Sequence, residues 1–164
     1  MSGWLKDMVT SSALMGALLR IIHPELYAAG IQALTTLASH PELVKEGDEL
    51  AAILQVWSSP YSSYSIISNR ESIGHRDNNS RPAWYDMLVS VGTYNEGVLT
   101  LPGLGLTFQY NPGTVVGLCG KLLKHAVPEV VGNRVCLAYY MRDKVHERIE
   151  VSAPGWMTLD KYEG

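Results

Sequence analysis

The feature of the sequence that most constrains its fold is a series of short β-forming runs after Pro60. Gly, Pro and Asn residues separate these runs, for example at Gly97, Pro102-Gly103 and Gly132-Asn133. Strands this short and this evenly spaced are typical of a sandwich or a jelly roll. The expected strands are 64–67, 87–91, 98–101, 106–110, 114–118 and 134–141.

The first third of the chain has the period of an α-helix instead. Apolar residues recur about every 3.6 positions from Trp4 to Ile22, and Pro24 ends this first helix. A second helix is expected to begin at Pro24, which suits a first turn, and a third is expected over 50–57. Helices followed by strands predict an α+β fold in which the N-terminal helices pack on one sheet.

The length of 164 residues and the hydrophobic content of 46% are enough to fill one core. We therefore expect a single domain over 1–164, with a helical preamble at 1–58 and a strand-rich core at 59–164. Cys119 and Cys136 do not make a disulfide framework, so we expect buried thiols in a reducing compartment. The apolar N-terminal stretch is too short and too polar to cross a bilayer, which favours an intracellular protein without membrane contact.

The charge of the chain is unevenly distributed. The net charge of −3 argues against strong nonspecific binding to nucleic acid. Between Arg70 and Arg148, however, nine Lys and Arg residues stand against seven Asp and Glu residues, a balance of +2. The rest of the chain has four basic and nine acidic residues, a balance of −5. This asymmetry indicates either an anion-binding face on an acidic body or ordinary variation of surface charge.

His75 and Asp77 form the most informative motif of the sequence. Residues two apart in an extended chain project to the same side, so the imidazole and the carboxylate converge on one point. His125, fifty positions later, supplies a second imidazole. Two imidazoles and one carboxylate make the facial triad that suits non-haem iron(II), with open positions for a chelating 2-oxo acid and O2. The other histidines are interpreted as structural or solvated: His23, His40 and His146.

Arg134 follows His125 by nine positions and begins an apolar strand. A largely buried arginine needs an anionic partner. One partner is the far carboxylate of 2-oxoglutarate, bound through a bidentate fork that lysine does not reproduce. The alternative is an internal salt bridge with an acid such as Glu129. The neighbouring triad favours the cosubstrate.

Longer segments of the chain carry a resemblance to a known family. They are SNRESIGHRDNNSRPAWYDMLVSVGTY, LTLPGLGLTFQYNPGTVVGLCGKLLKHAV and GNRVCLAYYMRD, preceded by the helical LLRIIHPELYAAG. Together they resemble the ten-eleven-translocation/J-binding-protein family of base oxygenases, and most of all its short fungal members. The resemblance covers most of the chain. It implies a double-stranded β-helix (jelly-roll) core with His75, Asp77 and His125 on Fe(II) and Arg134 on 2-oxoglutarate.

The resemblance also implies contacts to a substrate base. Arg70 lies where the family has an arginine beside the cosubstrate and the base. Tyr140 lies where an aromatic ring stacks on a flipped base. Arg142 and Asp143 follow where base edges are contacted, and Ser80 lies where some relatives make a polar contact to the base.

The activity that the resemblance implies is oxidation of the methyl group of a methylated nucleobase, most directly 5-methylcytosine to 5-hydroxymethylcytosine in nuclear DNA. N6-methyladenine, a protein side chain or a small metabolite are alternative substrates for the same chemistry. A non-catalytic jelly-roll binding module is a further alternative. Many relatives have additional segments that grip duplex DNA, so this shorter chain is expected either to act on single-stranded nucleic acid or to rely on a partner subunit for duplex binding.

Overall fold

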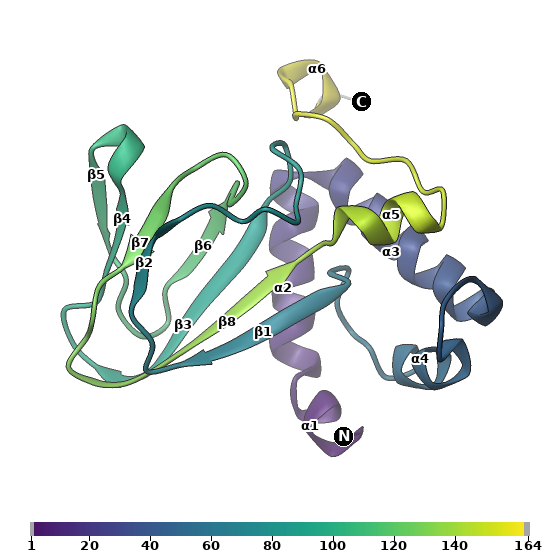
Figure 1. The fold of residues 1–164 in the computed structure, drawn as a ribbon, viewed down its shortest axis with the longest axis horizontal. Coiled ribbons are helices and arrows are strands. Elements are labelled where there is room, and N and C mark those ends of the chain that lie inside the picture. The colour runs from purple at the N-terminus through teal and green to yellow at the C-terminus, as the bar shows by residue number, and fades with distance from the viewer. Residues whose placement is uncertain (1, 163–164) are drawn as a thin grey trace. The chain divides into compact units, whose positions relative to one another are not determined.

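A computed structural model describes residues 2–162 and divides them into two compact units. The helical unit consists of residues 2–62 and 141–162, and the strand unit consists of residues 63–140 (Figure 1). Each unit contains a hydrophobic cluster of its own. The single domain expected over 1–164 stays a prediction.

The helical unit confirms the predicted helices, with shifted boundaries. The first predicted helix is divided at Met8, although its hydrogen bonds continue, because the Met8 N–H donates to the Trp4 carbonyl at 3.1 Å. The third predicted helix begins and ends three residues earlier than expected. The elements are α1 (Ser2–Asp7), α2 (Val9–Ile22), α3 (Pro24–Ser39), the 3-10 helix η1 (Pro41–Leu43), α4 (Gly47–Leu54), α5 (Asp143–Arg148) and α6 (Leu159–Tyr162).

His23 joins α2 to α3 and is fully buried. Its Nδ1 accepts the backbone N–H of Leu26 at 3.2 Å, which caps the first turn of α3. Its Nε2 lies 3.0 Å from the carbonyl of Gly155 and therefore carries the hydrogen. Burial lowers the pKa of His23 below its ordinary value. The structural role predicted for this histidine is confirmed.

The core of the helical unit forms along one face of α3. Ala29, Ala33 and Leu37, each four positions apart, are buried together with Ile149 and Val151 from the segment that follows α5. Small residues on α3 allow this close approach, and the two branched side chains fill the space.

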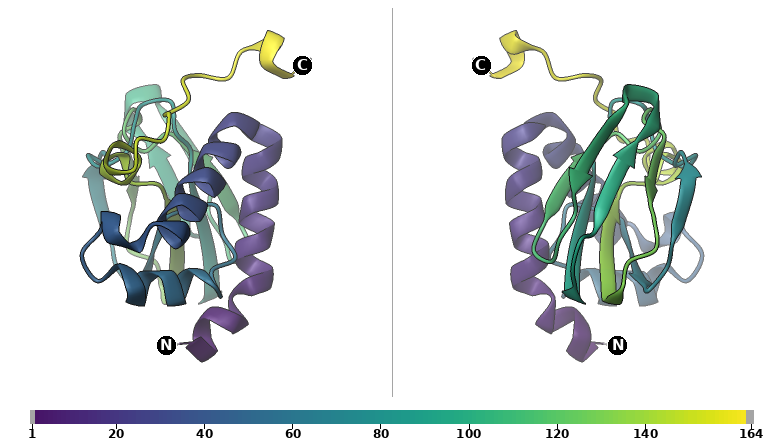
Figure 2. Two further views of the ribbon diagram at one scale, coloured as in Figure 1. Left: turned by 90° about the vertical axis from the view of Figure 1, so that its right-hand side faces the viewer. Right: turned by 90° about the vertical axis from the view of Figure 1, so that its left-hand side faces the viewer.

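The strand unit consists of two four-stranded antiparallel sheets, whose orders are β1-β8-β3-β6 and β2-β7-β4-β5. Leu88 and Val116 from the first sheet pack with Leu99 and Val127 from the second, so the core lies between the sheets. Figures 1 and 2 show these strands from different sides. The strands are β1 (Ser63–Ser68), β2 (Ser72–His75), β3 (Asp86–Tyr94), β4 (Val98–Leu101), β5 (Leu106–Gln109), β6 (Val115–Leu118), β7 (His125–Val127) and β8 (Gly132–Tyr140).

This arrangement confirms the α+β class and the jelly-roll core. All six predicted strands are present, and β2 and β7 add two that the sequence did not predict. Cys119 and Cys136 are buried free thiols, as expected. No helix within residues 2–162 has the length and apolar character that crossing a bilayer requires.

Candidate active site

The two histidines of the predicted triad face each other across neighbouring strands. His75 is the last residue of β2, His125 is the first residue of β7, and the two are direct partners in this antiparallel pair. Their ring centroids lie 4.3 Å apart. Asp77 follows β2 by two residues, and its carboxylate oxygens lie 3.8 Å from Nε2 of His75 and 3.6 Å from Nε2 of His125. One ligand atom from each residue lies within 4.8 Å of the others.

Backbone hydrogen bonds fix which nitrogen of each histidine is available. Nδ1 of His75 lies 2.8 Å from the carbonyl of Ile73, and Nδ1 of His125 lies 3.0 Å from the carbonyl of Leu123. A carbonyl only accepts, so in both rings Nδ1 carries the hydrogen. Nε2 of the neutral ring therefore presents a lone pair toward Asp77. The same second contact orients metal-binding histidines in general.

Gly120 makes room for the carboxylate of Asp77. Its carbonyl accepts the backbone N–H of Asp77 at 3.0 Å. A Cβ at this position would lie 2.4 Å from Oδ2 of Asp77 and 2.7 Å from Oδ2 of Asp86. Real Cβ atoms do not approach other atoms this closely, so any larger residue at 120 must displace the carboxylate.

The donor set fits Fe(II). Two imidazole nitrogens and one carboxylate converge, and this is the composition of the facial triad in non-haem iron oxygenases. The side chains of His75 and Asp77 are 44% and 45% exposed, whereas that of His125 is 7% exposed. The site is thus anchored on its buried side and accessible to small molecules on the other.

A cavity of about 90 Å³ extends from the triad to Arg134. The rest of its lining is mainly apolar and includes Ile67, Leu88, Val127 and Ala138. Arg134 lies on β8 and is 3% exposed. A buried positive charge and the His75, Asp77 and His125 triad therefore line the same, mainly apolar cavity.

Arg134 forms no ion pair with any carboxylate in residues 2–162, and Glu129 is not its partner. Its Nε donates to Oγ of Ser90 at 3.2 Å, and Nη1 donates to the carbonyl of Arg70 at 3.5 Å. Its guanidinium carbon lies 5.1 Å from the centroid of the Tyr110 ring. Neutral groups thus hold the guanidinium, and its charge stays available for an anion in the cavity.

Arg70 and Ser80 do not line this cavity. Arg70 contributes only its backbone carbonyl to Arg134, while its exposed side chain borders a separate hollow with Glu71 and Glu129. Ser80 is 6% exposed, and its hydroxyl has no hydrogen-bond partner in the described part of the chain. The substrate roles of both residues remain predictions.

Tyr140 ends β8, and its hydroxyl lies 3.0 Å from Oγ of Ser65 on β1. It also does not line the cavity. Arg142 and Asp143 belong to the helical unit, where Asp143 begins α5 and the Arg142 N–H donates to Oγ of Ser62 at 3.2 Å. The base contacts expected of these residues also remain predictions.

The sequence did not predict the residues that support Arg134. Ser90 and Tyr94 lie on β3, and Tyr110 follows β5; the three are buried. One feature of the sequence could have identified Ser90. It is a serine at an inward position of a mainly apolar strand, where a buried hydroxyl requires a hydrogen-bond partner.

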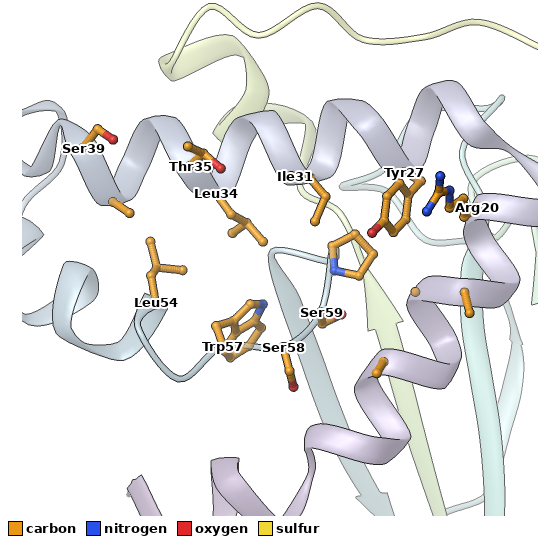
Figure 3. Close-up of a pocket in the computed structure, with 15 residues that line it drawn as sticks. Arg20, Tyr27, Ile31, Leu34, Thr35, Ser39, Leu54, Trp57, Ser58 and Ser59 are labelled. Carbon is orange, nitrogen blue, oxygen red and sulfur yellow. The ribbon is translucent and has the colours of Figure 1, made fainter.

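A larger cavity, about 560 Å³, lies in the helical unit (Figure 3). Tyr27, Ile31 and Leu34 of α3 line it together with Trp57. Its one charged residue is Arg20, whose guanidinium carbon lies 5.7 Å from the centroid of the Tyr27 ring. It contains no His, Asp, Glu or Cys, so the size of this cavity does not identify it as the catalytic site.

Comparison with known proteins identifies the family. The Tet_JBP family, described as the oxygenase domain of the 2OGFeDO superfamily, matches residues 3–143. No curated protein matches the chain. Among solved structures it is similar to NgTET1 in complex with 5mC DNA, with a TM-score of 0.48 and 20% sequence identity, over 64% of this chain and 42% of that one. The chain thus spans less than half of the length of that protein. The family match covers most of the sequence, and the chain belongs to the Tet_JBP family of Fe(II)- and 2-oxoglutarate-dependent oxygenases.

Proposed function

We propose that this oxygenase oxidises the methyl group of a methylated nucleobase, most directly 5-methylcytosine to 5-hydroxymethylcytosine in DNA. The observation that carries the proposal is one cavity lined both by a triad that could hold a metal and by Arg134, which is buried and has no carboxylate partner within residues 2–162. Membership of the Tet_JBP family supports the nucleobase as the substrate.

In this proposal His75, Asp77 and His125 hold Fe(II). The bound metal supplies the redox chemistry by which O2 converts 2-oxoglutarate to succinate and CO2, with one oxygen atom inserted into a C–H bond of the methyl group. The backbone carbonyls of Ile73 and Leu123 keep both histidines in the tautomer that ligation needs.

Arg134 binds the far carboxylate of 2-oxoglutarate. Its guanidinium presents donors in a planar fork that matches a carboxylate, and the cavity around it is mainly apolar. The 2-oxo end of the cosubstrate is then directed toward the triad. The apolar lining also excludes the water that would compete for both ends.

A methyl group inside a duplex does not reach the triad, so the target nucleotide must leave the base stack. The half-exposed side chains of His75 and Asp77 support access from outside the cavity. Tyr140 is proposed to stack on the extruded base, with Arg70, Ser80, Arg142 and Asp143 as further contacts.

The test is analysis of nucleosides by mass spectrometry. The protein is incubated with Fe(II), ascorbate and 2-oxoglutarate, and with DNA that contains 5-methylcytosine or N6-methyladenine, as single strands and as duplexes. The expected product is 5-hydroxymethylcytosine together with an equal amount of succinate. Reactions without 2-oxoglutarate, and reactions of the His125→Ala variant, serve as controls.

Each other outcome has a distinct meaning. Succinate without a changed nucleoside would reject the nucleobase and favour a protein side chain or a metabolite as the substrate. Loss of the N6-methyl group alone would move the proposal to methylated adenine. No succinate from any substrate, in a protein that binds the metal, would favour a binding module.

A further inference from the structure

The guanidinium of Arg134 is held at one edge and free at the other. Of the five N–H donors of an arginine, Nε–H is used by Ser90 and one Nη1–H by the carbonyl of Arg70. The side chain of Tyr110 is a further hydrogen-bond partner, which leaves at least two donors without a partner within residues 2–162. The contact at Nε fixes the plane of the fork, and hence the direction in which the free donors point.

The contact at Nε is the first link of a buried hydrogen-bond chain. The Ser90 hydroxyl lies 2.5 Å from the hydroxyl of Tyr94, which in turn donates to the carbonyl of Tyr110 at 2.5 Å. Ser90 is fully buried, and Tyr94 is 4% exposed. The chain therefore runs from Arg134 through two hydroxyls to the backbone, out of contact with water.

Donors and acceptors in this series of hydrogen bonds can be arranged in only one way. A carbonyl cannot donate, so the single hydrogen of the Tyr94 hydroxyl goes to Tyr110, and the Tyr94 oxygen accepts from Ser90. The single hydrogen of Ser90 is then committed to Tyr94, and the Ser90 oxygen is left to accept from Arg134. Each hydrogen bond fixes the direction of the one before it. The Tyr94 oxygen therefore accepts from Ser90, and the Ser90 oxygen accepts from Arg134.

The strands hold the members of this chain in place. Ser90 and Tyr94 lie four positions apart on β3, so their side chains share one face. β3 pairs with β8 from Met87 to Tyr94, with Ser90 opposite Cys136 and Gly92 opposite Arg134. The guanidinium and its acceptor are thus fixed by the same central strand pair.

We propose that Ser90 and Tyr94 are positioning residues that aim the free edge of Arg134 into the cavity, and that they thereby make the site selective for a 2-oxo acid with a second carboxylate. The inference rests on the proposed function, in which Arg134 receives that carboxylate. The two residues touch neither cosubstrate nor metal. They act through the orientation of one side chain.

The test compares two cosubstrates that differ in the far carboxylate. Dissociation constants of 2-oxoglutarate and of pyruvate are measured by calorimetry on the anaerobic Fe(II) protein, for the wild type and for Ser90→Ala and Tyr94→Phe. The loss of a buried acceptor is expected to weaken 2-oxoglutarate about tenfold in Ser90→Ala and about threefold in Tyr94→Phe. Pyruvate lacks the group that Arg134 binds, so its dissociation constant should change less than about twofold.

Two further variants control for folding and chemistry. Ser12→Ala removes a buried hydroxyl of the helical unit that does not line the cavity, so its affinity for 2-oxoglutarate should equal that of the wild type. Ser90→Thr retains a hydroxyl and should restore affinity relative to Ser90→Ala. In turnover, the apparent KM for 2-oxoglutarate should rise in Ser90→Ala and Tyr94→Phe, while kcat at saturation stays unchanged.

The proposal is overturned if both variants bind 2-oxoglutarate as the wild type does, or if they weaken the two 2-oxo acids equally. Should Ser90→Ala not fold, the isosteric Tyr94→Phe decides alone. Arg134→Lys separates this inference from the function on which it rests. If that variant binds 2-oxoglutarate normally, Arg134 is not the carboxylate ligand; if only Arg134→Lys weakens binding, the positioning role alone is wrong.

Discussion

His75 and His125 are direct partners across the antiparallel pair of β2 and β7, although fifty positions separate them in the chain. Because the pairing is set by the backbone, both rings extend from fixed points on one sheet. The backbone carbonyls of Ile73 and Leu123, each two residues before its histidine, hold the two rings in the same tautomer. The positions of the two imidazoles are therefore set by strand pairing and by backbone hydrogen bonds.

Replacement of His125 by alanine is expected to reduce the affinity for Fe(II) by more than about a hundredfold, because the site loses its most buried ligand. Anaerobic calorimetry with Fe(II) measures the change. His40→Ala is the matched control, since His40 is exposed and bonds only Glu42. Equal affinities of the wild type and His125→Ala would exclude His125 from the metal site.

Gly120→Ala should weaken metal binding without the loss of any ligand. Its new Cβ would lie 2.4 Å from Oδ2 of Asp77, so the carboxylate must move away from the histidines. We expect the affinity for Fe(II) to fall by about tenfold to a hundredfold. Gly103→Ala is the control, because a Cβ there meets nothing within 4 Å. Normal metal affinity in Gly120→Ala would show that the Asp77 carboxylate can move aside and still bind the metal.

Arg134→Ala is expected to raise the apparent KM for 2-oxoglutarate, since the site loses a charge-assisted fork worth about 2 to 4 kcal/mol. Steady-state release of succinate measures this constant. Arg20→Ala is the comparison, because Arg20 is an exposed arginine of the helical unit that does not line the cavity of the triad. An unchanged KM in Arg134→Ala would remove this residue from the cosubstrate site.

If the ring of Tyr140 stacks on the base, Tyr140→Ala should uncouple the turnover of 2-oxoglutarate from the oxidation of the base. Turnover of 2-oxoglutarate without substrate is expected to persist, whereas oxidation of the base should fall. Tyr140→Phe keeps the ring and loses the hydroxyl that contacts Ser65, so it should retain base oxidation. Parallel loss of both activities in Tyr140→Ala would indicate a role in folding.

His23 is expected to make the protein less stable in mild acid. Burial holds the pKa of His23 below its ordinary value of 6.5; the carbonyl of Gly155 and Glu25 oppose this effect, and Lys161 adds to it. The unfolded chain therefore binds a proton that the folded chain resists. The stabilising contribution is complete above about pH 6.5 and is lost as the pH falls toward the folded pKa.

Thermal unfolding of wild type and His23→Asn at about pH 7 and about pH 5 measures this contribution. Asparagine keeps a capping acceptor for α3 but does not titrate. The decrease in Tm between the two pH values should be smaller in His23→Asn. Equal decreases in the two proteins would show that other groups account for the acid sensitivity.

The long elements of the fold were predictable from the sequence, and the two strands that carry His75 and His125 were not. The period of α3 and the β-rich runs of β3 and β8 extend over nine residues or more, so their patterns stand out. β2 and β7 have four and three residues, which is too short for an alternation to be recognised. Their pairing is a long-range contact that no local pattern encodes.

The triad itself was predicted, because the spacing of His75 and Asp77 and the family resemblance both identify it. The support of Arg134 was not predicted. Ser90 and Tyr94 have no charge and no recognisable motif, and their importance appears only when β3 and β8 are paired. The resemblance also implied base contacts by Arg70 and Tyr140, neither of which lines the cavity beside the triad.

The site draws on both layers of the jelly roll, since the histidines lie on the sheet of β2 and β7 while Arg134 lies on the sheet of β8. A cosubstrate bound at both ends would act as a brace that ties one layer to the other. Binding of 2-oxoglutarate should then slow amide hydrogen exchange in both β8 and β7. Binding of Fe(II) alone should slow exchange only in the sheet that contains β2 and β7. The rigidity of the two sheets would thus depend on whether 2-oxoglutarate is bound.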